Sequence, residues 1–160
     1  MKKGQHLPYS EGDWFAVPLN KGTFGVGRLA RKGGKWNVLF GYFFGPPRAE
    51  VPPESELISL KATDAIMLSR FGDLYLISGR WQIIRDTQAW SRLLWPMPAF
   101  GRVDSAKQAW ETVYDDDEPN QWVDMQKSTL SKIAVLPKDS VMGAGFVEKR
   151  LARLLHQGGK

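Results

Sequence analysis

The sequence has no cysteine and only two histidines among its 160 residues. Without cysteine it forms no disulfide, offers no thiolate to a metal and has no cysteine nucleophile. His6 and His156 lie near the two ends, where a rigid catalytic base is uncommon. Acid–base catalysis needs a group that titrates near neutral pH and a partner that orients it. Two histidines without cysteine are also a poor zinc site. The sequence therefore predicts a protein that is not an enzyme and uses no metal or cofactor.

Long apolar runs are missing too. The longest, residues 38–45, is far shorter than the roughly 20 residues of a membrane-spanning helix. The basic residues at the N-terminus are not followed by the apolar segment of a signal peptide. We therefore expect a cytoplasmic protein that does not bind membranes. The length predicts a single domain over residues 1–160 with a full hydrophobic core, and nothing indicates its oligomeric state.

Aromatic residues, in contrast, are abundant, with seven Trp, eight Phe and four Tyr. Residues 11–46 contain three runs rich in aromatic and β-branched residues. Turn-forming clusters at residues 20–22 and 32–34 separate these runs. Gly25, Gly27 and Gly41 interrupt them where a sharply bent sheet needs a residue without a Cβ. The pattern predicts a curled, antiparallel N-terminal sheet that resembles a small barrel.

The rest of the chain predicts further antiparallel strands. Residues 65–71, 74–77 and 80–84 are nearly continuously apolar, as in strands covered on both faces. β-Branched and aromatic residues at 112–114 predict a strand over 107–114, and residues 128–135 read as an edge strand. Between these regions, the prolines within residues 90–100 indicate a short helical turn followed by extended chain.

The C-terminus carries the one convincing helix pattern. Val147, Leu151, Leu154 and Leu155 fall at i, i+4, i+7 and i+8, which forms one apolar stripe. The glycines at 158–159 then end the helix. The expected fold class is α+β and mostly β, with the C-terminal helix packed on the sheet.

Positive charge gathers around one predicted hairpin. Residues 1–53 contain eight Lys or Arg against three Asp or Glu, while residues 54–160 contain fourteen of each. The favoured reading of this excess is a solvated turn. The alternative is a small β-barrel module that binds nucleic acid through a phosphate-contacting edge with an aromatic residue for stacking. Its binding residues would be Arg28, Arg31, Lys32, Lys35 and Trp36.

Negative charge gathers in one turn, at Asp115, Asp116, Asp117 and Glu118. No glycine follows at the position that a calcium-binding EF-hand loop requires, so calcium is not supported. As a solvated loop the turn needs no further explanation. As a contact for a basic protein partner it would speed association and add specificity. These four residues are the candidate partner-binding site.

Several segments together resemble the immunity protein 26 family of bacterial toxin–immunity systems. The resemblance is clearest at residues 9–19, 25–31 and 39–45, and weaker at 70–74, 79–81 and 143–151. It implies a protein that binds a cognate toxin inside the producing cell and neutralises it without catalysis. Families of this kind share a scaffold but differ in their toxins, so the resemblance supplies no site residues. A nucleic-acid partner is not expected under this interpretation.

Overall fold

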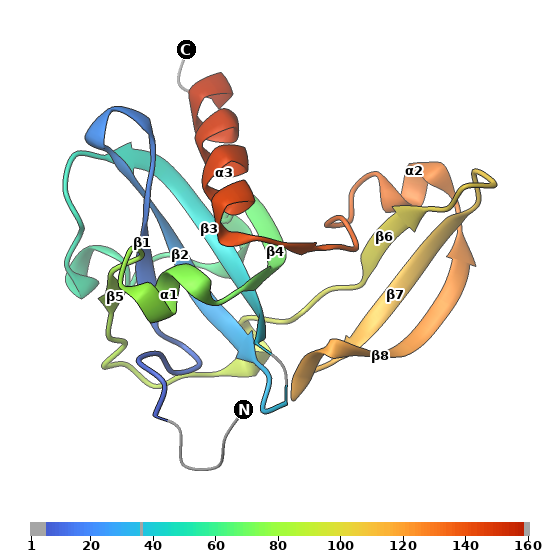
Figure 1. The fold of residues 1–160 in the computed structure, drawn as a ribbon, viewed down its shortest axis with the longest axis horizontal. Helices are drawn as coiled ribbons and strands as arrows, with labels where there is room; N and C mark the ends of the chain where they lie inside the picture. The colour runs from blue at the N-terminus through green and yellow to red at the C-terminus, as the bar shows by residue number, and fades with distance from the viewer. Residues whose placement is uncertain (1–5, 36, 159–160) are drawn as a thin grey trace.

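A curled six-stranded sheet forms the larger part of the molecule (Figure 1). The computed structural model describes residues 6–35 and 37–158. In spatial order the strands are β5 (Ile83–Ile84), β1 (Trp14–Pro18), β2 (Phe24–Lys32), β3 (Val38–Arg48), β4 (Met67–Gly72) and β9 (Val141–Met142). Neighbours are antiparallel except β4 and β9, and the β2–β3 register shifts twice. The expected curled antiparallel sheet is confirmed, although it does not close into a barrel.

A smaller antiparallel sheet projects from this body as an arm (Figure 1). Its strands are β6 (Phe100–Val103), β7 (Ala109–Asp115) and β8 (Glu118–Ser128). The strand expected at 107–114 is therefore confirmed. The edge strand expected at 128–135 is wrong, because β8 ends at Ser128 and helix α2 (Leu130–Ile133) follows. Thr129 begins that helix, and its hydroxyl accepts a hydrogen bond from the Lys132 amide.

The predicted C-terminal helix is α3 (Ala144–Gly158), and it packs on one face of the large sheet (Figure 1). Val147 and Leu151 are fully buried, and Leu154 is half-buried. A Cβ on Gly25 would lie 2.7 Å from Cδ2 of Leu151, so this glycine leaves the space that the helix occupies. The expected docking of the apolar stripe on the sheet is confirmed.

Both faces of the large sheet carry a hydrophobic core. Phe15 belongs to the core beneath α3, while its neighbour Trp14 points into a second core on the opposite face. The alternation of side chains along a strand produces this division. The second core also contains Phe40, Trp95 and Phe100. Two covered faces explain why the strand sequences are nearly continuously apolar.

Two of the remaining expectations need correction. The apolar run at 74–77 forms helix α1 (Leu74–Ser78) and not a strand, and it ends at Gly79 with a φ of 86°. The run at 80–84 contributes only the two residues of β5. The described residues also contain four short 3₁₀ turns: η1 (Asn20–Gly22), η2 (Glu54–Glu56), η3 (Ala62–Asp64) and η4 (Arg92–Leu94). η4 is the helical turn expected within residues 90–100.

Candidate partner-binding cleft

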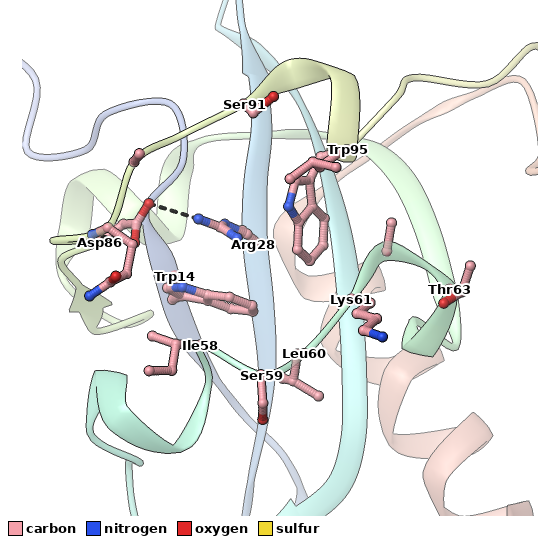
Figure 2. A pocket seen from close by; sticks show the side chains of 14 residues that line it. Trp14, Arg28, Ile58, Ser59, Leu60, Lys61, Thr63, Asp86, Ser91 and Trp95 are labelled. Atoms are coloured by element: carbon pink, nitrogen blue, oxygen red, sulfur yellow. Dashed lines mark hydrogen bonds and ion pairs between the residues drawn. The ribbon is translucent and has the colours of Figure 1, made fainter.

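A cleft of about 770 Å³ opens beside the second core. Pockets that bind ligands in proteins typically measure about 300–1,000 Å³. Residues 58–63 form one wall and residues 86–95 the other, while Trp14 and Arg28 line the floor between them (Figure 2). At the rim, the apolar side chains of Ile58 and Leu94 are 52% and 71% exposed. The cleft therefore combines a buried aromatic floor with an exposed apolar rim.

Three indole rings surround the guanidinium of Arg28. Its Cζ lies 4.5 Å from the ring centre of Trp14 and 4.7 Å from the ring centres of Trp90 and Trp95. Tryptophan is the strongest cation–π partner among the side chains, and such contacts are worth about 2 kcal/mol when desolvated. The charged end of Arg28 is thus fixed in the floor of the cleft (Figure 2).

Hydrogen bonds fix the same guanidinium in one orientation. Nε donates to the carbonyl of Gly12 at 3.0 Å, and Nη2 donates to the Asp86 carboxylate at 2.7 Å. Burial lowers the pKa of Arg28, although the negative charge of Asp86 opposes this shift. Within the described residues no group accepts a hydrogen bond from Nη1, and this nitrogen is not fully buried. The N–H groups of Nη1 are therefore not engaged by the described residues, and Arg28 lines the cleft.

Two carboxylates hold the first part of the outer wall. Asp13 accepts hydrogen bonds from the Asp86 amide at 3.2 Å and from Arg85 at 3.1 Å. Glu54 accepts two hydrogen bonds from Thr87, and these bonds lower the pKa of Glu54. Residues 85–87 are therefore held by Asp13, just before β1, and by Glu54 at the start of η2.

Glu11 holds the second part of that wall. It accepts a hydrogen bond from the indole of Trp90 at 2.8 Å and two from Arg92 at 2.7 and 2.9 Å. The hydrogen bonds with Glu11 are the largest cause of a raised pKa at Arg92. Because both ends of the wall are anchored in this way, the cleft is formed before any partner arrives.

The acidic turn, where β7 meets β8, lies at the end of the arm nearest the body and contacts it (Figure 1). Asp116 pairs with Arg31 at 2.9 Å and Asp117 pairs with Arg92 at 2.8 Å. Their side chains remain 59% and 85% exposed. The sequence did not reveal these internal partners. A role for the turn in binding a partner protein stays a prediction.

The two other acidic residues of the turn are half-buried. Asp115 accepts a hydrogen bond from the Asp117 amide at 2.7 Å. Glu118 accepts one from the backbone amide of Lys35 at 2.8 Å. The structure therefore places the acidic turn against the basic hairpin that the sequence revealed.

The expectation of a solvated basic hairpin is wrong for its two arginines. Arg28 is 7% exposed and Arg31 is 2% exposed. Besides its pair with Asp116, Arg31 donates to the carbonyls of Ala30 and Trp95. The charged groups are buried because carboxylates far along the chain fold back to meet them. Both guanidinium groups therefore bond mainly to groups within the protein.

The remaining members of the basic group contribute less to a surface. Nζ of Lys32 lies 5.9 Å from the ring centre of Tyr9, and Lys32 is half-buried. The backbone of Lys35 is engaged by Glu118. Trp36 lies outside the described residues.

Arg70, a third buried arginine, was not identified from the sequence. Arg70 of β4 donates to Asp139 at 2.9 Å and to the Tyr114 hydroxyl at 3.0 Å. Burial is the largest cause that raises the pKa of Tyr114 to about 12, and its hydrogen bond to Asp139 adds to the effect. The available signal was an arginine inside an apolar strand, which needs a partner when buried. This cluster joins the large sheet to the arm.

Among residues 6–35 and 37–158, no three His, Cys, Asp or Glu side chains are placed to hold a metal ion. In the same residues, no helix has the length and apolar character needed to cross a membrane.

Comparison with known proteins identifies the family. The family model described as Immunity protein 26 matches residues 10–112. The chain belongs to the immunity protein 26 family. No curated protein and no solved structure matches it. Every residue that lines the cleft falls within the segment shared with the immunity protein 26 family, whereas the acidic turn and α3 lie beyond it.

Proposed function

We propose that this member of the immunity protein 26 family protects a bacterium by binding a cognate toxin in the cytoplasm of the producing cell. Neutralisation occurs by binding and involves no catalytic step. The match of the family model to residues 10–112 carries this proposal. The preformed cleft within that segment supports it, because a rigid concave surface loses little conformational entropy on binding.

We further propose the acidic turn as an electrostatic contact for a basic toxin. The carboxylates of Asp116 and Asp117 are largely exposed although each is paired with an arginine. A carboxylate has about four lone-pair positions, so both groups have room for further donors. Charges at the rim of an interface mainly raise the association rate. The burial of Arg28 and Arg31 favours this function over the alternative of nucleic-acid binding.

A stoichiometric titration tests the proposed function. A candidate toxin domain, sought among the neighbouring genes, is purified, and its activity is measured with increasing amounts of the immunity protein. We expect complete inhibition near one equivalent and a stable complex on gel filtration. Co-expression of the two proteins should restore the growth of cells that the toxin alone arrests.

Two outcomes of this titration would contradict the proposal. Full toxin activity at a large excess of the protein would remove the role in immunity. Complete inactivation by a small fraction of an equivalent would indicate turnover, and would therefore contradict neutralisation by binding.

A further inference from the structure

We propose that the cleft beside Arg28 receives a tyrosine side chain of the toxin. That the partner is a toxin rests on the proposed function. The chemistry of the bound group is inferred from the contacts in the cleft. The walls of the cleft match an aromatic ring, and its polar end matches a hydroxyl group.

The apolar part of the cleft favours an aromatic occupant. The indoles of Trp14 and Trp95 lie at its base, with ring centres 5.8 Å apart and their planes at 89° (Figure 2). Leu60 adds a half-buried apolar contact, and the exposed Ile58 and Leu94 are at the rim. Exposed apolar residues around a concave site are typical of protein interfaces. The volume of about 770 Å³ admits an aromatic side chain with its flanking backbone.

The polar part of the cleft favours a hydroxyl group. Nη1 of Arg28 donates to no described residue and is not fully buried, so its N–H groups are available to an acceptor on the occupant. Asp86 lies directly beside it and, as a carboxylate, has lone pairs beyond those used by Arg28 and the Gln88 amide. An occupant that also donates a hydrogen bond to Asp86 should therefore bind more tightly. A phenol hydroxyl accepts one hydrogen bond and donates another, whereas an indole only donates and phenylalanine does neither.

The charges around this polar end favour a neutral occupant. Burial of a charged group without a partner is costly, and the charged groups near the cleft are of both signs. Asp86 pairs with Arg28, and Asp13 pairs with Arg85. Glu54 also lies close enough to influence Arg28, and Lys61 lines the cleft. Three cations and three carboxylates balance, so neither an acidic nor a basic side chain is favoured over tyrosine.

Two small amides test the chemistry without any toxin. The indole N–H signals of Trp14 and Trp95 are followed by NMR while N-acetyl-tyrosinamide or N-acetyl-phenylalaninamide is added. We expect saturable shifts with the tyrosine amide and affinity about tenfold or more weaker for the phenylalanine amide, because a hydrogen bond to a charged donor is lost. Equal affinities, or no shift at either indole, would overturn the inference.

A cleft-filling variant links the cleft to the toxin. Ser59 lines the cleft and is exposed, so Ser59→Trp should fill the space without disturbing the core. Ser55 is exposed in η2 and does not line the cleft, which makes Ser55→Trp the matched control. We expect Ser59→Trp to lose both tyrosinamide binding and toxin neutralisation. Ser55→Trp should keep both, and thermal unfolding checks that both variants are folded.

The two proposals can fail separately. If Ser59→Trp neutralises the toxin as well as the unmodified protein does, the cleft inference is overturned and the immunity function stands. If the unmodified protein does not bind the toxin, the immunity function is overturned. The proposal that the tyrosine belongs to a toxin then fails with it. The amide titration still reports the chemistry of the cleft in that case.

Discussion

Buried arginines on the large sheet join segments that lie far apart in the sequence. Arg28, Arg31 and Arg70 lie on strands of the large sheet, and each is at most 7% exposed. Each has a carboxylate partner on a segment far away in the sequence. A buried ion pair is weak evidence for net stability, but removal of one partner leaves an uncompensated charge. These positions are therefore sensitive to single substitutions.

The ion pair of Arg70 and Asp139 gives the clearest test, because both side chains are about 95% buried, with 5% and 6% exposed. Asp139→Asn should lower the free energy of unfolding by about 3–5 kcal/mol, measured by urea denaturation. The control is Glu56→Gln, which removes an exposed partner of Arg48 and should cost less than about 1 kcal/mol. Similar losses in both variants would refute the account of Arg70.

Two buried tyrosines should make the free energy of unfolding depend on pH in the alkaline range. Burial raises the pKa of Tyr42 to about 12, and burial is also the main reason that the pKa of Tyr114 is about 12. An unfolded chain ionises its tyrosines near about 10. Between these values the unfolded state releases protons that the folded state retains, so stability should fall as pH rises from about 10 towards 12. Urea denaturation at a series of pH values measures this; constant stability across the window would contradict it.

Secondary-structure elements differ in how far local sequence determines them. The apolar stripe at Val147, Leu151 and Leu154 predicted α3 correctly, because an amphipathic pattern of this length has one stable arrangement. The short run at 74–77 was assigned to the wrong class, because a brief apolar stretch fits a buried strand or a helix equally well.

The strand β8 was missed for a different reason. Residues 120–124 are all exposed, so neither face of the strand is covered and no alternation appears in its sequence. Its position is set by pairing with β7. An element of this kind depends on contacts with its neighbour, which local patterns do not reveal.

Leu151 should be the residue that anchors α3. It is fully buried and lies over Gly25. Leu151→Ala should lower the free energy of unfolding by about 2–5 kcal/mol. The control is Phe146→Ala on the same helix, because Phe146 is 68% exposed, and it should change stability by about 0.5 kcal/mol or less. Equal effects in urea denaturation would disprove the docked helix.

At the scale of the whole molecule, ion pairs join the arm to the body. The acidic turn reaches Arg31 and Arg92, and Asp139 after α2 reaches Arg70.

The cleft could not be predicted from the sequence, because it is also built from distant segments. Its floor comes from β1 and β2 while its walls come from residues 58–63 and 86–95, and no local pattern indicates that these segments meet.

Replacement of Asp115, Asp116 and Asp117 by Asn should therefore have two effects. The buried Arg31 loses its charged partner, so the free energy of unfolding should fall by about 1–3 kcal/mol. Loss of exposed negative charge should also slow association with a basic toxin at low salt, and less so at high salt. Stopped-flow binding at two salt concentrations separates the effects. Equal association rates at low salt would exclude the turn as a toxin contact.

The spacing of these ion pairs has a consequence during synthesis. Arg28 and Arg31 leave the ribosome 58 and 85 residues ahead of Asp86 and Asp116. Until those carboxylates emerge, the nascent N-terminal sheet would have to bury two uncompensated cations. A chain that stops at Thr112, where the family match ends, contains Asp86 but lacks Asp116 and Asp139, the partners of the buried Arg31 and Arg70. Such a chain should therefore show little β structure by circular dichroism. The sequence shared by relatives is then shorter than the length of chain that must be complete before the native sheet forms.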